Sequence, residues 1–279
     1  MPTGRLGQGV STMEHKALGS TDMMIPEVGL GVWRYNGGVE PLRTGIELGA
    51  FLIDTAEIYG TEEVVGQAIA GLRDRVVLAT KVSGNHLRSD EVRRAAEASL
   101  RRLNTDILDL YQVHWPNPGV PIQDTMRAME SLVDDGLVKH IGVSNFSLHQ
   151  LQAAQASLRN APIVANQVLY NLNRRGIEAD LLPYCLEQHI TIIAYTPLDD
   201  GRLATPAVFP HDWRMRAVEQ VAAFSQKTPA QVALNWCTSH PNVVVIPKSN
   251  SPARIMENCQ ASGWRLSLEQ LHYLNATFA

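Results

Sequence analysis

The chain has 279 residues, of which 45% are hydrophobic and 19% are charged, and its formal net charge is -4. This composition is typical of a globular protein with a large buried core, and it excludes the disordered and fibrous classes. The negative charge argues against nucleic acid as a partner, and no apolar run is long enough to cross a membrane. Because no secretory signal pattern opens the chain, we expect a cytoplasmic protein.

Residues 1–12 are rich in Gly, Ser and Thr, and they precede the first patterned segment. We therefore expect residues 1–13 to be a flexible leader and residues 14–279 to form a single domain, because no linker or low-complexity tract interrupts them. The three cysteines, Cys185, Cys237 and Cys259, lie far apart and lack the CxxC spacing of a metal or redox site. They are predicted to be buried free thiols, and no metal site is expected.

After a hairpin predicted around Leu18-Gly19-Ser20, short apolar runs alternate with amphipathic segments. This alternation is typical of repeated βα units and a parallel sheet. The candidate strands are 28–32, 51–53, 76–80, 107–113, 140–143, 163–168, 191–194 and 243–246. Apolar residues at i, i+3 and i+4 predict helices between them, as over 92–103 and 126–133, and another is expected over 268–274.

Eight such repeats close into a barrel more readily than they form an open sheet, because closure removes both exposed edges. The predicted fold is a single (β/α)8 TIM barrel with an N-terminal β-hairpin, and a doubly wound open sheet is the alternative. Gly29 and Gly31 are not followed by the third glycine of a GxGxxG motif. That absence disfavours a Rossmann cofactor site.

Polar residues end three of the predicted strands, where the active sites of α/β barrels form. Asp54 follows 51–53, Lys81 follows 76–80 and His114 follows 107–113. Taken singly they could be a loop cap, a solvated lysine and a core histidine. Taken together, Lys81 and Asp54 can pair at neighbouring strand ends and offset the desolvation cost of both charges.

Tyr59 lies on the loop after Asp54. A neighbouring ammonium is expected to lower the pKa of a phenol from about 10, which makes Tyr59 a candidate proton donor. Carbonyl reduction needs a proton at oxygen, and a general acid typically contributes about 10²–10⁴ in rate. His114 is then suited to orient the carbonyl through a hydrogen bond.

From about residue 17 the chain resembles the aldo-keto reductase family, as bacterial NADPH-dependent members represent it. Residues 49–60, GAFLIDTAEIYG, are similar to the first family signature, and residues 246–258 are similar to the last. The resemblance implies NADPH-dependent reduction of a small-molecule carbonyl substrate. It also implies a catalytic tetrad in which a Tyr donates the proton, Lys and Asp tune that Tyr, and a His positions the carbonyl. The matching residues are Asp54, Tyr59, Lys81 and His114.

The segment 246–254 ends a strand and begins a helix, with Ser251 as the N-cap and a proline in the first turn. A cation at Arg254 opposes the helix dipole by about 0.3–1 kcal/mol, and a bound phosphate would reverse that sign. Lys248, Ser249 and Arg254 are therefore interpreted as a site for a phosphate monoester, with a solvated basic helix start as the alternative. The resemblance identifies this phosphate as the adenosine 2′-phosphate of NADP(H).

Further cofactor contacts come from strand ends and from the resemblance. Ser144, Asn145 and Gln167 carry groups that can grip a nicotinamide carboxamide, and Tyr195 can stack on the ring, with core packing as its alternative. Glu257 and Asn258 are expected at the adenine. The other cofactor positions are Gly31, Val32, Asp54, Thr196, Leu198, Ile246 and Asn250.

Trp33 and Trp115 resemble the aromatic walls of the family's substrate pocket, beside Tyr59 and His114. Asp199-Asp200 departs from the family pattern, because two carboxylates would repel a pyrophosphate unless they face solvent or Arg202 neutralises them. The short tail predicts an open pocket and broad acceptance of aldehydes and activated ketones, and we expect a monomer. Two alternatives stay open: an NADPH-binding regulatory or sensing subunit with little turnover, and a cofactor-free barrel isomerase or hydrolase.

Overall fold

The computed structural model describes residues 12–207 and 212–279. Its main sheet has eight strands, all parallel, in the order β10-β9-β8-β7-β6-β5-β4-β3 among the residues described. These strands are β3 (Leu30–Gly31), β4 (Leu52–Asp54), β5 (Val77–Val82), β6 (Leu108–Val113), β7 (Val138–Ser144), β8 (Ile163–Leu169), β9 (Thr191–Tyr195) and β10 (Val243–Val245). Each predicted strand overlaps one of them.

The two outer strands of this sheet meet and close the barrel. Val28 pairs in parallel with Val245, and the amide of Gly29 donates to the carbonyl of Val245 at 2.8 Å. A Cβ atom at Gly31 would lie 2.5 Å from the carbonyl oxygen of Ile246, so only glycine allows the strands to approach this closely. The predicted (β/α)8 barrel is confirmed, and the doubly wound alternative is wrong.

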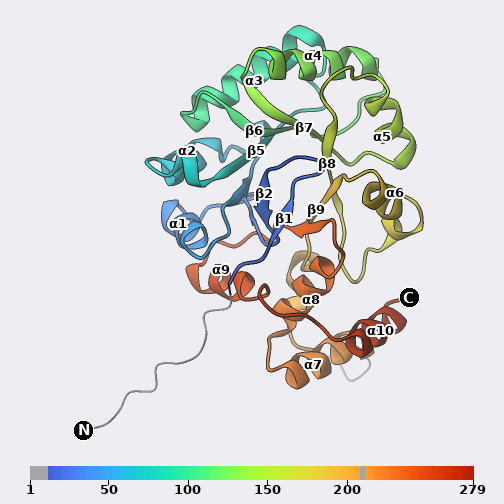
Figure 1. Cartoon of the computed structure of the whole chain (residues 1–279). Helices are drawn as coiled ribbons and strands as arrows, with labels where there is room; N and C mark the ends of the chain where they lie inside the picture. The colour runs from blue at the N-terminus through green and yellow to red at the C-terminus, as the bar shows by residue number, and fades with distance from the viewer. Residues whose placement is uncertain (1–11, 208–211) are drawn as a thin grey trace.

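A small antiparallel hairpin, β1 (His15–Ala17) and β2 (Met24–Pro26), precedes the barrel, as predicted. It lies across one end of the barrel in Figure 1. The side chains of Leu18 and Ile25 are buried among residues of the barrel interior. Because the amide of Gly19 donates to Thr191, the first residue of β9, the hairpin covers the N-terminal ends of the strands and leaves the other end to the site.

Helices surround the sheet (Figure 1). They are α1 (Val39–Glu47), α2 (Glu62–Ile69), α3 (Ser89–Leu103), α4 (Ile122–Asp134), α5 (Leu148–Gln155), α6 (Leu181–Glu187), α7 (Trp213–Ser225), α8 (Pro229–Thr238), α9 (Pro252–Cys259) and α10 (Leu268–Thr277). The predicted face of α3 is buried from Val92 to Leu103, and α4 buries Met126, Met129 and Leu132. Each of the buried Val, Leu and Met side chains contributes about 1.5–3 kcal/mol on burial.

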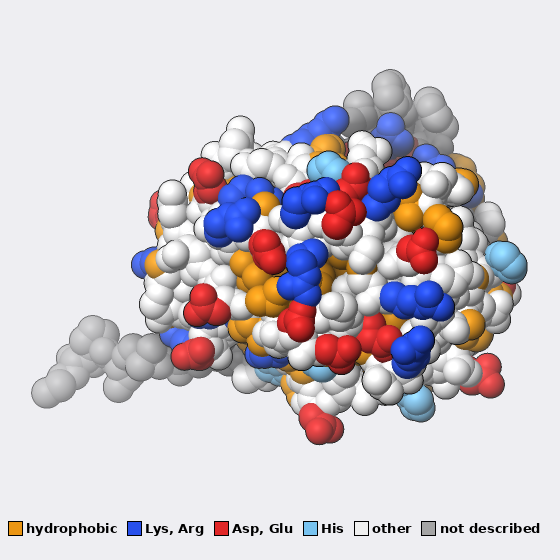
Figure 2. Space-filling view, turned by 90° about the horizontal axis from the view of Figure 1, so that it is seen from above, with side chains coloured by type: hydrophobic (Ala, Val, Ile, Leu, Met, Phe, Trp, Pro, Cys, Tyr) orange, Lys and Arg blue, Asp and Glu red, His pale blue; other side chains and the backbone are white. Residues whose placement is uncertain are grey.

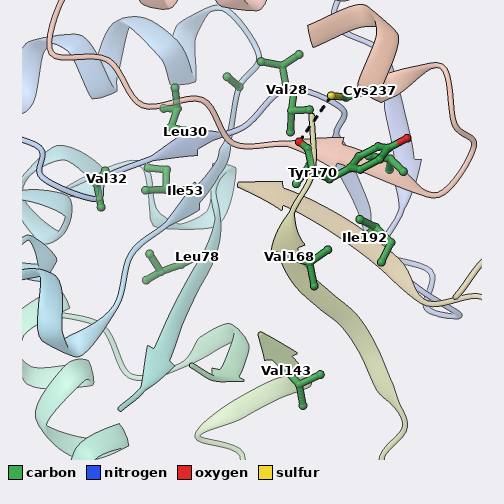
Figure 3. Packing of buried hydrophobic residues seen from close by; sticks show 14 of the residues in the cluster. Val28, Leu30, Val32, Ile53, Leu78, Val143, Val168, Tyr170, Ile192 and Cys237 are labelled. Atoms are coloured by element: carbon green, nitrogen blue, oxygen red, sulfur yellow. Dashed lines mark hydrogen bonds between the residues drawn. The ribbon is translucent and has the colours of Figure 1, made fainter. Parts of the chain in front are cut away.

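The main hydrophobic core lies between the strands and the helices. Figure 3 shows Leu30, Ile53, Leu78 and Ile192 projecting from their strands into this layer. The three cysteines are buried and free, as predicted, and burial raises the pKa of Cys185 and Cys259 to about 12. Across residues 12–207 and 212–279, no group of His, Cys, Asp and Glu side chains is arranged to hold a metal ion.

The expected leader, residues 1–13, lies outside the described residues except for its last two positions, and Met13 packs against the core. In the described part of the chain, no helix has both the length and the apolarity needed to span a membrane. Basic and acidic side chains intermingle on the face over α3 and α4 (Figure 2). On α3, Arg94 and Asp90 form an ion pair at 2.8 Å. No continuous basic surface is visible on the face in Figure 2.

Candidate active site

A pocket of about 1280 Å³ opens at the C-terminal ends of the strands. It is larger than the roughly 300–1,000 Å³ of a typical small-molecule site. The predicted residues that line it are Gly31, Val32, Trp33, Asp54, Tyr59, His114, Trp115, Ser144, Asn145, Gln167, Tyr195, Thr196, Leu198, Ile246, Lys248, Ser249, Arg254, Glu257 and Asn258. Two do not line it: Lys81 is fully buried, and Asn250 instead accepts a hydrogen bond from the amide of Asn36.

Lys81 and Asp54 form a buried ion pair at the floor of the pocket. The Lys81 Nζ atom donates to Asp54 Oδ2 at 2.6 Å and to the carbonyl oxygen of Thr55 at 2.8 Å. The two residues come from the neighbouring parallel strands β4 and β5, whose C-terminal ends meet at this edge. Burial lowers the pKa of Lys81, and the Asp54 carboxylate opposes that shift. The expected pairing is therefore present.

The second oxygen of Asp54 accepts two amide hydrogen bonds across the barrel interior. Gln167 Nε2 donates to Oδ1 at 2.7 Å, and Gln112 Nε2 donates to the same atom at 3.2 Å. The buried carboxylate thus has partners for both oxygens, as a buried charge requires. Gln112 was not among the predicted site residues, although a glutamine inside the apolar strand β6 was a usable signal. Gln167 lines the pocket as predicted, but its amide is also part of this network.

Tyr59 stands between Lys81 and His114. Its Oη atom lies 3.4 Å from Lys81 Nζ and 3.3 Å from His114 Nε2. The expectation that Lys81 lowers the pKa of Tyr59 is wrong in this structure, because burial and the Asp54 carboxylate raise that pKa above its ordinary value. The charge of Lys81 is largely offset by Asp54, so desolvation decides the direction. Tyr59 is therefore a protonated phenol, which can donate.

His114 is a neutral imidazole in this setting. Burial, with a further contribution from Lys81, lowers the pKa of His114 to about 3. Its Nε2 faces the Tyr59 hydroxyl, while its buried Nδ1 has no hydrogen-bond partner among the described residues. A histidine kept for structure alone would be expected to have both ring nitrogens satisfied. The interpretation of His114 as a fully satisfied core residue is therefore disfavoured.

A second polar group, made of Ser144, Asn145 and Tyr195, lies along the pocket wall. The Tyr195 hydroxyl donates to Asn145 Oδ1 at 2.9 Å, and Asn145 Nδ2 donates to the carbonyl of His114 at 3.1 Å. Asn145 has a φ of 62° and Thr196 a φ of 51°, in the left-handed region that non-glycine residues rarely adopt. Such backbone strain clusters at ligand sites, and both residues line the pocket.

Cationic side chains and a helix start form the other end of the pocket. Lys248 and Arg254 are exposed, line the pocket and make no salt bridge to any part of the chain that the structure describes. Ser251 is the N-cap of α9, as predicted, but its side chain makes no capping hydrogen bond, and the first turn holds no acidic residue. This donor set of cations and helix amides fits a phosphate monoester.

The Asp199-Asp200 pair divides between two environments. Asp199 is 8% exposed, and its Oδ2 accepts from Asn173 Nδ2 at 3.1 Å and lies 3.8 Å from Arg202. Asp200 is exposed and lines the pocket. Arg202 thus pairs with the first carboxylate only, so neither of the two expected arrangements describes both residues.

Several residues that line the pocket were not predicted from the sequence. Arg34, Ile58, Asn173 and Arg214 line the pocket but come from loops, from the short helix at 57–59 and from the start of α7. Residues in such segments do not end a strand, so the strand-end signal could not identify them. For Arg34 and Ile58 the adjacency to Trp33 and Tyr59 was the available signal.

The model of the aldo/keto reductase family matches residues 27–278. Methylglyoxal reductase YeaE of Escherichia coli is 40% identical over 271 residues, covering 93% of each chain, and glyoxal reductase of Bacillus subtilis is 36% identical over 258 residues, covering 90% of this chain and 88% of that one. A crystal structure of an aldo-keto reductase from Klebsiella pneumoniae in complex with NADPH superposes with a TM-score of 0.87 at 40% identity, covering 95% of this chain and 96% of that one.

Proposed function

The chain belongs to the aldo/keto reductase family, and from this premise we propose that Tyr59 is the proton donor in NADPH-dependent reduction of aldehydes and ketones to alcohols. One observation carries the proposal. At the floor of the pocket, the Tyr59 hydroxyl lies within hydrogen-bonding reach of both Lys81, which is paired with Asp54, and His114. This combination supplies a phenol, a charge that stabilises the phenolate, and a neutral group that can orient a carbonyl.

When bound, NADPH supplies the hydride for the carbonyl carbon. Tyr59 gives its proton to the carbonyl oxygen, and the Lys81 ammonium, 3.4 Å away, stabilises the phenolate that results. Asp54 holds Lys81 in place, and Gln112 and Gln167 fix Asp54 in turn. His114 stays uncharged, because burial lowers its pKa to about 3, and it acts by hydrogen bonding to the carbonyl oxygen.

For the cofactor, we propose that Lys248, Ser249 and Arg254 hold the 2′-phosphate, since they combine cations with the start of α9. Tyr195 would hold the nicotinamide ring, and Ser144, Asn145 and the remaining amide oxygen of Gln167 would bind its carboxamide. Asn258 and Glu257 would hold the adenine. Gly31, Val32, Thr196, Leu198 and Ile246 complete the contacts, with Asn250 just outside the pocket lining.

Replacing Lys248 or Arg254 with alanine is expected to weaken NADPH binding by about 10-fold or more. A hydrogen bond to a charged group contributes about 1.5–3 kcal/mol, and each 1.4 kcal/mol is a factor of about ten. NADH lacks the 2′-phosphate, so its dissociation constant should change less than threefold. Quenching of tryptophan fluorescence measures both constants, with the exposed helix residue Arg216→Ala as the control. Equal weakening for NADPH and NADH would contradict the assignment.

The substrate class that we propose is small 2-oxoaldehydes together with other aldehydes and activated ketones. Two relatives act, by their names, on methylglyoxal and glyoxal. The substrate end of the pocket is lined by half-exposed apolar side chains, Trp33, Ile58 and Trp115, near Tyr59 and His114. These side chains suit compact carbonyl compounds with an apolar or weakly polar body, which supports broad acceptance.

Loss of NADPH absorbance with a panel of aliphatic, aromatic, sugar-derived and 2-oxoaldehyde substrates tests this function. We expect turnover with several members of the panel and higher kcat/KM for the 2-oxoaldehydes than for the sugars. NADPH binding without turnover on any carbonyl would overturn the proposal and favour a sensing subunit. Strict activity on one compound would contradict the broad acceptance alone.

The alternative of a regulatory NADPH-binding subunit has no support from these relatives, and the complete tetrad favours catalysis. A cofactor-free isomerase or hydrolase is likewise disfavoured by the cationic phosphate site. We also propose that residues 14–279 form one catalytic domain, which acts in the cytoplasm as a monomer. The family match over 27–278 supports one domain, the three buried free thiols support the cytoplasm, and the net charge of -4 supports a monomer.

A further inference from the structure

Glu57 connects the turn that carries Tyr59 to the end of β5, the strand that carries Lys81. It begins the short helix η1 (Glu57–Tyr59), two residues before Tyr59. Its side chain is only 9% exposed, and its Oε1 atom accepts a hydrogen bond from the amide of Ser83 at 2.6 Å. Ser83 follows Lys81 by two residues, just after β5 ends at Val82. One oxygen of the Glu57 carboxylate therefore joins the turn that holds Tyr59 to the end of the strand that holds Lys81.

We propose that Glu57 is a positioning residue that sets the separation of Tyr59 and Lys81, and this rests on the function proposed above. In the described residues, the hydrogen bonds between 56–58 and the loop 83–88 all run through the Glu57 carboxylate. The Tyr59 Oη to Lys81 Nζ distance of 3.4 Å is already at the upper limit of a hydrogen bond. A displacement of about 1 Å would break this contact, and such shifts can cost about 10²-fold in rate.

The Glu57 oxygen is important as an acceptor because the amide of Ser83 lies beyond the end of β5, outside the hydrogen bonds of the sheet. Ser83 is 7% exposed, so its amide needs a partner, and Glu57 supplies one. His86 Nδ1 lies 2.9 Å from the same Glu57 oxygen, while its own amide donates to the carbonyl of Ser83. The loop thereby closes on the carboxylate from two sides. His86 orients Glu57, and Glu57 holds the loop against η1.

The start of the Tyr59 turn is tied to β5 at Thr55, whose amide donates to the carbonyl of Ala79 at 2.9 Å and whose carbonyl accepts from Lys81 Nζ at 2.8 Å. The amide of Tyr59 donates to the carbonyl of Ala56 at 3.0 Å, and the Thr55 and Thr61 hydroxyls share a hydrogen bond of 3.0 Å. These contacts define the shape of the turn and anchor its start, but none of them holds residues 57–59 against the end of β5. Without Glu57, we expect residues 57–59 to pivot about Thr55 and to shift relative to Lys81.

Three substitutions at Glu57 distinguish the position of its hydrogen-bond acceptor from the charge of its side chain. Glu57→Gln keeps an oxygen acceptor for the Ser83 amide, Glu57→Asp withdraws the acceptor by one methylene group, and Glu57→Ala removes it. We expect kcat to stay within about threefold of wild type for Gln and to fall about 5- to 10-fold for Asp and about 10- to 100-fold for Ala. The control is Glu63→Ala, an exposed residue of α2, which should match wild type.

Two readouts distinguish positioning from a general loss of structure. The dissociation constant for NADPH should stay within twofold of wild type in every variant, because the phosphate site lies at β10 and α9. The pH profile of kcat should shift for Ala and Asp, since the Tyr59–Lys81 contact lengthens, and should return to the wild-type profile for Gln.

The proposal is overturned if folded Glu57→Asp and Glu57→Ala both retain kcat within twofold of wild type, or if Gln loses as much as Ala. If Glu57→Ala does not fold, the comparison of Asp with Gln decides the question alone. Failure of the wild-type protein to reduce any carbonyl would instead contradict the proposed function. An active wild type with unaffected Glu57 variants contradicts only the positioning role.

Discussion

Tyr59→Phe is expected to lower kcat for carbonyl reduction by about 10²–10⁴, the range that a positioned general acid contributes. The substitution removes only the hydroxyl that lies between Lys81 Nζ and His114 Nε2. The phenyl ring can keep its packing against Trp33, whose ring centroid lies 4.8 Å away. KM and the NADPH dissociation constant should therefore change little, and the loss should appear in kcat. Stopped-flow or steady-state loss of NADPH absorbance measures the effect.

Tyr195→Phe is the matched control for Tyr59→Phe. It removes a second pocket hydroxyl, which donates to Asn145 at 2.9 Å and does not contact Lys81. We expect this control to alter NADPH binding more than kcat. Turnover of Tyr59→Phe within threefold of wild type would remove Tyr59 as the acid, and the barrel would then need another proton donor within reach of the pocket floor.

Lys81→Met is expected both to abolish turnover and to lower the free energy of unfolding by about 3–5 kcal/mol, because it leaves Asp54 buried without its counter-charge. Asp54 is 2% exposed and Lys81 is fully buried, so neither group can turn to water for compensation. Methionine has nearly the same length and keeps the packing, which isolates the electrostatic loss. Urea unfolding followed by circular dichroism measures the stability.

The double variant Asp54→Asn with Lys81→Met should recover part of the lost stability, because no unpaired charge remains buried. It should recover no activity, because the ammonium that stabilises the phenolate is still absent. A stability loss below about 1 kcal/mol in Lys81→Met would mean that water or a neighbouring group relieves the buried carboxylate, contrary to the structure. Equal stability of the single and double variants would be a second contradiction.

Local pattern was sufficient to predict the fold and to predict that the polar residues at the strand ends lie together. Apolar runs of strand length alternate with helix-period segments, and this local signal survives in β5, β6 and β8 with bounds close to those predicted. In a closed parallel barrel all strands end on the same face, so residues that follow the runs must converge. For that reason Asp54, Lys81 and His114 could be assigned together before any distance was known.

Only the tertiary structure decided the quantities that depend on three-dimensional distance and on desolvation. The sequence placed a lysine near Tyr59 and so predicted a lowered pKa, but burial and the nearby Asp54 carboxylate raise it instead. Gln112 joined the site because its strand brings it to Asp54, and Glu57 because a turn brings it to the amide of Ser83. Sequence order fixes which residues reach the rim of the barrel. Contacts across the rim depend on side-chain direction and burial, which the pattern of apolar residues in the sequence does not encode.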